Sequence, residues 1–265
     1  MEKTLKYQNK TIFYRDAGQG KPVLLLHGFG ETGEVWKNQI PSLQTDFRLI
    51  IPDLPGSGRS EAVDDMSMDG LADCVKAVLD DAGLTSGTTS LIGHSMGGYI
   101  TLAFVEKYQQ YLRSFGLFHS TSYADSDEKK EVRRKGIAFV RQHGADEFLK
   151  TSIPNLFSPQ TKQQNPDLID EFIRSLHNFS AQAIVSYYEA MMSRPDRTHL
   201  LKTTRLPVIF VIGEHDNAVS PGDSLKQAHL PEISYIDLLH QSGHMGMLEE
   251  PEKCNQLLNK FLRET

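Results

Sequence analysis

The short stretch around Ser95 constrains what this chain can fold into more than any other part of it. Residues 89–92 favour β-structure, and Gly93 and Gly97 flank the serine two positions away on either side. The next charged residue after the turn is Glu106. This order predicts a buried strand, a sharp turn and a buried helix, with glycines that prevent Cβ clashes and leave the serine hydroxyl free. The same pattern also occurs in ordinary glycine-rich turns, so the rest of the chain must distinguish the two.

Strand-like and helix-like segments alternate on both sides of this turn. Residues 4–16 alternate in polarity and predict an antiparallel hairpin, whereas residues 22–26 form the continuous apolar run of a strand buried on both faces. Further strands are predicted at 47–51, 89–92, 114–118, 206–212 and 233–239, and helices at 67–82, 221–229 and from 251 onward. This alternation predicts an α/β fold with eight mostly parallel strands and helices on both faces of the sheet.

The alternation stops at residue 119. Residues 119–203 are charged and poor in strand signals, and they predict helices at Asp127–His143, Glu147–Phe157, Pro166–Phe179 and Ala181–Ser193. We interpret the run of charges from Asp125 to Lys135 as a solvated helix face. The last of these helices carries two tyrosines and two methionines, which either line a pocket or pack the insertion onto the sheet: Tyr187, Tyr188, Met191 and Met192.

Composition and charge exclude several classes of protein. The chain has 265 residues, 39% hydrophobic and 23% charged, as expected of one globular unit with room for an insertion. Its net charge of −6, with mixed signs throughout, offers no basic face for nucleic acid. Apolar runs are only of strand length and none follows Met1, so we expect no membrane span, no secretory signal and a cytoplasmic location. Cys74 and Cys254 are interpreted as buried thiols, and we expect neither a metal nor a cofactor.

The residues that end the predicted strands form a short set of candidates. Functional groups in an open parallel sheet collect beyond the carboxyl ends of its strands, where this chain carries His27 to Gly30, Asp53, Ser95, His119, Asp216 and His244. A serine needs a neighbouring base to become nucleophilic, and that base needs an acid that orients it. Ser95, Asp216 and His244 follow one of the chain orders known for such triads.

Other residues compete for the roles of acid and base. Asp53 and Asp125 are alternative acids, and His215 and His240 are alternative bases. His244 is favoured because glycines close to it on both sides suit an imidazole carried on a tight loop.

Taken together, these motifs resemble those of the α/β-hydrolase family, in the form that carries a helical cap. The matching motifs are His27-Gly28-Phe29-Gly30, Asp53 to Ser60, Gly93 to Gly98, Gly213 to Asp216 and Gly243-His244. The resemblance implies a core of residues 1–118 and 204–265, with a cap of residues 119–203 inserted after the sixth strand. The chain is similar to family members that are serine carboxylesterases, enol-lactonases and carbon–carbon bond hydrolases.

The resemblance also implies roles for individual residues. The backbone amides of Phe29 and Met96 would form an oxyanion hole, His94 would help to hold the turn, and His27 would support the oxyanion loop. The residues expected to contact substrate are His119, Tyr187, Met191 and Val219.

The identity of the nucleophile narrows the chemistry. Family members that open epoxides or displace halide carry an aspartate at this turn, whereas Ser95 predicts an acyl-enzyme formed from an ester, thioester, lactone or amide. We therefore expect an enzyme that cleaves small or medium apolar carboxylic esters with a Ser-His-Asp triad. The expected partner is a small-molecule ester, with no nucleic acid or membrane, and the expected state is a monomer or homodimer.

Two alternatives stay open. A lactonase or carbon–carbon bond hydrolase of aromatic degradation resembles this chain, and the latter binds an acidic dienoate, usually through an arginine. The sequence places none of the candidate arginines in a pocket: Arg59, Arg141, Arg174 and Arg194. The other alternative is a hydrolase-like ligand receptor or signalling protein, in which the cap offers a partner surface.

Overall fold

A computed structural model describes residues 1–176 and 179–265, and in this part the chain forms one eight-stranded sheet. The strand order is β1-β2-β4-β3-β5-β6-β7-β8, with β1–β2 and β2–β4 antiparallel and the other pairs parallel. The predicted α/β fold with an eight-stranded, mostly parallel sheet is therefore confirmed. The strands are β1 (Glu2–Tyr7), β2 (Lys10–Ala17), β3 (Lys21–Leu26), β4 (Phe47–Pro52), β5 (Thr89–His94), β6 (Leu112–Phe118), β7 (Val208–Gly213) and β8 (Ser234–Leu239).

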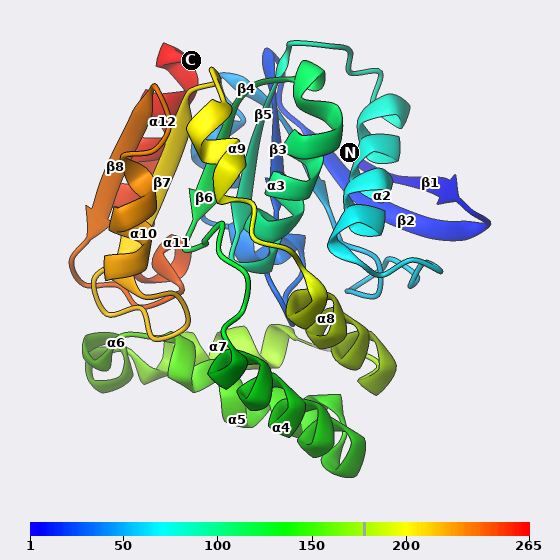
Figure 1. Cartoon of the computed structure of the whole chain (residues 1–265), viewed down its shortest axis with the longest axis vertical. Coiled ribbons are helices and arrows are strands. Elements are labelled where there is room, and N and C mark those ends of the chain that lie inside the picture. Colours follow the sequence, from blue (N-terminus) through cyan, green and yellow to red (C-terminus); the bar gives the residue numbers. More distant parts are fainter. Residues whose placement is uncertain (177–178) are drawn as a thin grey trace.

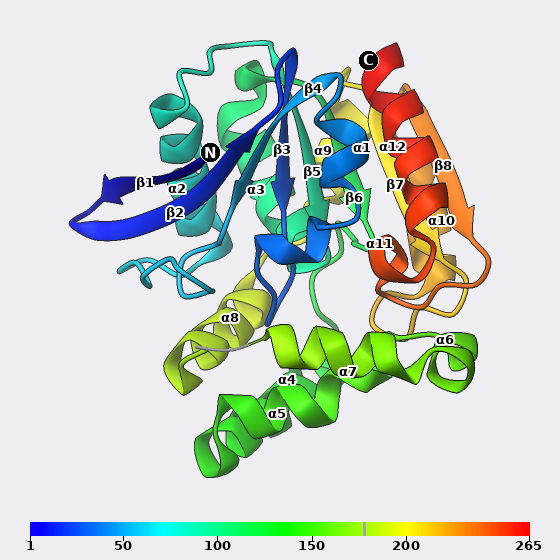
Figure 2. The ribbon, with the colours of Figure 1, turned by 180° about the vertical axis from the view of Figure 1, so that it is seen from behind.

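Helices cover both faces of this sheet. Side chains alternate along β3, so Val23 and Leu25 join one buried hydrophobic cluster while Leu24 and Leu26 join the other. Figure 1 shows α2, α3 and α10 on the near face, and Figure 2 shows α1 and α12 on the opposite face. Their bounds are α1 (Ile40–Leu43), α2 (Met68–Asp81), α3 (Met96–Tyr108), α10 (Pro221–Ala228) and α12 (Pro251–Glu264).

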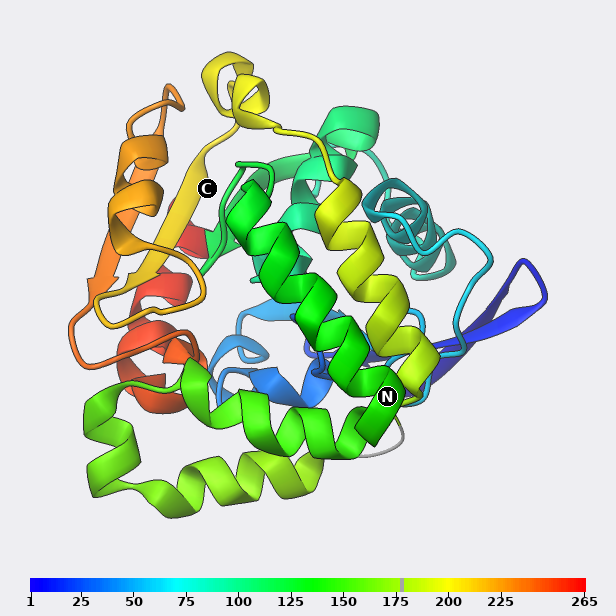
Figure 3. The ribbon, with the colours of Figure 1, turned by 60° about the horizontal axis from the view of Figure 1, so that its bottom comes forward.

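A group of helices lies beyond the carboxyl ends of the parallel strands. Figure 1 shows α4 to α8 below the sheet, and Figure 3 shows α4 and α8 side by side, in green and yellow-green. These helices are α4 (Asp127–His143), α5 (Ala145–Ser152), α6 (Pro159–Gln164), α7 (Pro166–Ser175) and α8 (Ala181–Ser193). Helix α9 (Thr198–Thr203) lies away from this group, beside α3. The division into core and cap stays a prediction.

Two predicted helices of the insertion differ from the observed ones. The helix expected at Glu147–Phe157 ends at Ser152, and a 3₁₀ turn, η3 (Ile153–Leu156), follows it. Pro154 explains the break, because proline is tolerated only in the first turn of a helix. Helix α6 was not predicted, although Ser158 and Pro159 carry its start signal. Helix α7 ends four residues before the predicted end, and residues 177–178 lie outside the described part.

Smaller elements complete the chain. A 3₁₀ turn, η1 (Gly33–Trp36), follows β3, η2 (Gln109–Tyr111) precedes β6, and α11 (Gly246–Glu249) precedes α12. None of the helices in residues 1–176 and 179–265 combines the length and apolar character needed to cross a membrane. Cys74 and Cys254 are free and buried, as predicted, and burial raises the pKa of the Cys74 thiol to about 12.

Candidate active site

Ser95 lies on a strained turn between β5 and α3. Its φ of 50° and ψ of −114° place a non-glycine residue in a sparsely populated conformation. Ser95 is half-buried, whereas the residues before and after it are buried. A Cβ atom on Gly93 would lie 2.3 Å from the carbonyl oxygen of Gly97, and one on Gly97 would lie 2.6 Å from that of His27. Both glycines are therefore required by backbone contacts, and the turn leaves Ser95 half-buried at the ends of the parallel strands.

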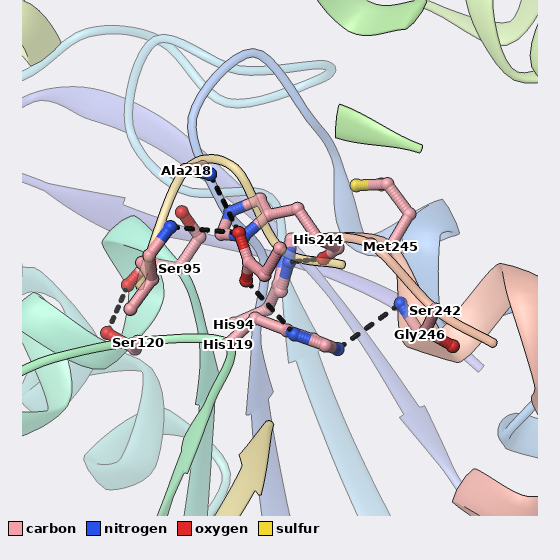
Figure 4. A network of polar contacts seen from close by, with 12 residues as sticks. His94, Ser95, His119, Ser120, Ala218, Ser242, His244, Met245 and Gly246 are labelled. Atoms are coloured by element: carbon pink, nitrogen blue, oxygen red, sulfur yellow. Dashed lines mark hydrogen bonds and ion pairs between the residues drawn. The ribbon is translucent and has the colours of Figure 1, made fainter. Parts of the chain in front are cut away.

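Asp216 accepts hydrogen bonds from several sides. Its Oδ1 accepts from the backbone N–H groups of Ala218 and Val219, at 2.8 Å each. Its Oδ2 lies 2.8 Å from Nδ1 of His244 and 3.3 Å from Nδ1 of His119. Figure 4 shows His119, His244 and Ala218 in one network of polar contacts with Ser95 nearby. Burial alone would raise the pKa of the Asp216 carboxyl, but the His244 and His119 contacts outweigh it and hold that pKa far below its usual range. The carboxylate thus orients the His244 ring, and no group in residues 1–176 and 179–265 hydrogen-bonds its Nε2.

His119 is a second imidazole beside the same carboxylate, with Nδ1 near Oδ2 but without a hydrogen bond to it. The N–H of Gly246 points to Nε2 of His119 at 3.3 Å, so Nε2 is the acceptor and Nδ1, which faces Asp216, carries the hydrogen. Burial lowers the pKa of His119 to about 4, despite the opposing effect of Asp216. The residue is 1% exposed and does not line the cavity described below. The expectation that His119 contacts substrate is wrong, because its ring is buried beside Asp216 and does not line the cavity.

A buried ion pair supports His244 from the other side. The two ring nitrogens of His94 lie 2.9 Å from Oε2 of Glu31 and 3.0 Å from the carbonyl oxygen of His244. Both neighbours are acceptors, so both nitrogens donate and the ring is an imidazolium. Burial alone would lower the pKa of His94, but Glu31 raises it. Oε2 of Glu31 also accepts from the N–H of Gly28. The sequence interpretation missed Glu31, although an acid placed directly after the His27 to Gly30 motif was the available signal.

Ser95 and His244 line the same cavity, which has a volume of about 390 Å³. Of the predicted substrate contacts, Met191 and Val219 line it. Tyr187 does not, and that expectation is wrong. The side chain of Tyr187 is fully buried, and its hydroxyl donates to the carbonyl oxygen of Pro55 instead. Most other lining residues come from the segments around α4, α5 and η3 or from the neighbouring turns: Phe29, Tyr99, Val132, Phe148, Leu149, Ser152, Ile153, Leu156, Tyr188, Asn217 and Ala218.

Two cations also line this cavity. Lys129 and Arg133 lie one helical turn apart on α4, so they occupy the same face of the helix. The interpretation of this charged run as a wholly solvated face is therefore wrong for these two side chains. Within the described residues, none of the four arginines considered from the sequence lines the cavity: Arg59, Arg141, Arg174 and Arg194.

Three of the competing acids and bases, Asp53, Asp125 and His240, are engaged elsewhere, and the fourth, His215, is exposed. Asp53 accepts from the backbone N–H groups of Gly33 and Arg59, so it shapes the loop after β4. Asp125 pairs with two arginines, and the His240 side chain is 72% exposed and pairs with Glu214. None of them lies against His244 in the described structure, which leaves Asp216 as its carboxylate partner.

His119, Asp216 and His244 also have the composition of a metal site, with one ligand atom from each within 4.8 Å of the others. The atoms that face one another are ring N–H groups and a carboxylate at hydrogen-bond distances. In addition, Nε2 of His119 accepts from Gly246. We therefore interpret the group as a hydrogen-bonded His244–Asp216 pair with His119 packed beside it, rather than a set of ligands.

Comparisons with known proteins agree with this architecture. The family model described as alpha/beta hydrolase fold matches residues 21–138. A thermophilic esterase from Thermogutta terrifontis, solved with malate bound, superposes with a TM-score of 0.92 and 29% identity, over 100% of this chain and 98% of its own.

Curated relatives are more distant. The dihydrolipoyllysine-residue acetyltransferase component of an acetoin cleaving system from Pseudomonas putida is 28% identical over 92% of this chain, which spans only 64% of that protein. A 2-hydroxy-6-oxo-6-phenylhexa-2,4-dienoate hydrolase from Comamonas testosteroni is 27% identical over 96% of this chain and 91% of its own length. The sheet order, the strained serine turn and these similarities agree on one architecture: the chain has the α/β-hydrolase fold and is similar to hydrolases of that fold.

Proposed function

We propose that this protein hydrolyses carboxylic esters through an acyl-enzyme on Ser95. The observation that carries the proposal is one shared cavity: a serine on a strained, half-buried turn and a histidine hydrogen-bonded to a buried carboxylate both line it. A serine hydroxyl needs this kind of base to attack a carbonyl carbon. Similarity to a solved esterase at 29% identity supports ester hydrolysis as the chemistry.

The proposed first step transfers one proton and forms one bond. Nε2 of His244 takes the proton of the Ser95 hydroxyl as its Oγ attacks the ester carbonyl, because Nδ1 is held by Asp216. The resulting imidazolium is stabilised by the Asp216 carboxylate. His244 then gives the proton to the leaving alcohol, which breaks the ester bond and leaves Ser95 acylated. Water, deprotonated by the same nitrogen, releases the carboxylic acid and restores the serine.

The proposed oxyanion hole uses the backbone amides of Phe29 and Met96. Phe29 lines the cavity, and Met96 is the first residue of α3, where helix N–H groups have no partner within the helix. Neither N–H donates to a protein acceptor in the part of the chain that the structure describes. Donors in such positions contribute a factor of about 10² to 10³ each to the rate.

Replacing Ser95 by alanine tests the proposal. We expect Ser95→Ala to lower kcat for p-nitrophenyl acetate and butyrate by about 10⁴-fold or more, because the nucleophile is lost, while circular dichroism and Tm stay close to those of the parent. A fluorophosphonate probe should label the parent and not the variant. Turnover within tenfold of the parent would exclude the assignment.

The two open alternatives give different results in the same assay. A carbon–carbon bond hydrolase, as in the relative from Comamonas testosteroni, would turn over a dienoate faster than any simple ester. A receptor would give a single-turnover burst with little steady-state hydrolysis. An acyl-chain series of p-nitrophenyl esters, measured beside lactones, therefore separates these functions from a carboxylesterase.

A further inference from the structure

The wall that α4 contributes to the cavity is cationic. Lys129 Nζ donates to the carbonyl oxygen of Ala218 at 2.8 Å, and no carboxylate pairs with it within residues 1–176 and 179–265. Ala218 lies two residues after Asp216, which places the ammonium group beside the loop that carries the proposed acid of the triad. An ammonium group has three donors, so this single contact leaves capacity for an anionic ligand.

Arg133 adds a second positive charge that its partner does not fully balance. Its guanidinium pairs with both oxygens of Asp125, and Asp125 is also paired with Arg194 at 2.9 Å. One buried carboxylate therefore serves two guanidinium groups. Arg194 is held away from the cavity against Tyr99, but Arg133 lines it and has 12% of its side chain exposed.

The acidic groups near the cavity do not cancel these charges. Glu31 lines the cavity but is paired with His94, and the two oxygens of Asp216 accept from three N–H groups. The remaining lining is dominated by apolar and aromatic side chains. Unbalanced cations that face a largely apolar cavity favour a ligand that brings an anion to them.

We propose that the substrates of this site are esters that also carry a carboxylate, which Lys129 and Arg133 bind while Ser95 attacks the ester carbonyl. The inference rests on the proposed esterase function and adds the substrate class. It changes the sequence-based expectation of small or medium apolar esters, because the cations lie on the face of α4 that meets the cavity.

A matched pair of esters tests the carboxylate. 4-Nitrophenyl hydrogen adipate and its methyl ester share the same acyl chain and leaving group and differ in one negative charge. We expect the parent to prefer the acid form, and Lys129→Gln to lower kcat/KM for the acid by about tenfold, chiefly through KM, because one charged contact is lost. Hydrolysis of the methyl ester should fall less than that of the acid, because the methyl ester brings no charge to Lys129. Raising the salt concentration should weaken only the reaction of the acid.

Control variants separate local from general charge effects. Lys135→Gln removes one charge from an exposed position of the same helix, outside the cavity lining, and should leave both esters unchanged. Arg133→Gln should repeat the selective loss, with its Tm measured because Asp125 loses one of its two partners. A parent that prefers the methyl ester, or a Lys129→Gln variant that slows both esters equally, would overturn the proposal.

A binding measurement tests the proposed anion site independently of ester hydrolysis. Adipate should bind Ser95→Ala by calorimetry, and it should bind Ser95→Ala/Lys129→Gln about tenfold more weakly. Absence of ester turnover in the parent would exclude the esterase function. Absence of a difference in adipate affinity between the two variants would exclude the anion site, whatever the turnover.

Discussion

At the scale of single residues, two buried histidines beside His244 carry different charges because their neighbours differ. His94 faces oxygen acceptors on both ring nitrogens, and its pKa is raised. His119 accepts a hydrogen bond from Gly246 on one nitrogen, and its pKa is lowered to about 4. The pair shows that the type of hydrogen-bond partner, rather than burial alone, sets the charge of an imidazole.

Glu31→Gln tests the charge on His94. The amide leaves a buried imidazolium without a counter-ion, and we expect the free energy of unfolding to fall by about 3 kcal/mol. Because His94 donates to the carbonyl of His244, kcat for p-nitrophenyl esters should also fall. Denaturant unfolding and steady-state kinetics measure both effects.

The matched control is Glu34→Gln, three residues along the chain. Glu34 is 48% exposed and pairs with Arg15 on the surface, so its loss should cost less than about 1 kcal/mol. Equal destabilisation by both variants would contradict an ion pair between Glu31 and His94.

At the scale of elements, the loop that carries His244 is joined to the segment after η3. The N–H of His244 donates to the carbonyl oxygen of Leu156 at 2.6 Å. Glu249 accepts from the N–H groups of Ser158 and Gly243, one on each of its oxygens, at 2.8 Å each. The position of His244 therefore depends on the segment that follows η3 as well as on the sheet.

Gly243→Ala tests this junction. A Cβ atom at this position would lie 2.6 Å from the carbonyl oxygen of Leu156 and 2.7 Å from the backbone nitrogen of Ser158, so backbone must move. We expect a loss of about 1–3 kcal/mol in the free energy of unfolding and a fall in kcat of about tenfold or more, because His244 is displaced.

Gly222→Ala is the matched control for that variant. It lies in the first turn of α10, and its Cβ atom would meet only the Ser220 hydroxyl oxygen, at 3.7 Å. Its Tm should stay the same or rise, because alanine restricts the unfolded chain more than glycine does. A Gly243→Ala variant that behaves like this control would exclude steric dependence on the junction.

At the scale of the whole molecule, the buried histidines link folding to pH. The pKa of His119 is about 4 in the folded protein and near 6.5 when unfolded, so between these values only the unfolded chain binds the proton. Stability that is complete above about pH 6.5 is therefore lost as the pH falls toward 4. His94, whose pKa is raised, acts in the opposite sense and contributes most below the unfolded value.

Comparing the parent with His119→Asn isolates the contribution of one histidine. A pKa of about 4 in the folded protein against about 6.5 in the unfolded chain corresponds to about 3 kcal/mol, so the parent should lose this much more unfolding free energy than the variant between pH 6.5 and 4. Denaturant unfolding at several pH values measures the two slopes. Parallel slopes would mean that His119 does not resist protonation in the folded protein.

Features that depend on neighbouring residues could be predicted from the sequence, whereas features that depend on contacts between distant residues could not. The bounds of α4 and α8 and the start of α12 agree with the periodicity and cap residues, because these signals are local. The separate roles of Glu31 and His119 could not be predicted, because their partners lie 63 and 97 residues away. Sequence spacing also could not show that the Tyr187 hydroxyl donates a hydrogen bond to the carbonyl oxygen of Pro55, whereas Tyr188 lines the cavity.

The sequence by itself determined the alternation of strands and helices and the sharp turn at Ser95, because hydrophobic period and glycine position act over a few residues. Only the tertiary structure decided which side chains surround that turn. Helix α4 shows the reason. Lys129 and Arg133 share the face of this helix that lines the cavity. If the same helix packed against a filled apolar core, its polar face would point to solvent. A helical pattern encodes which residues share a face, and packing determines what that face meets.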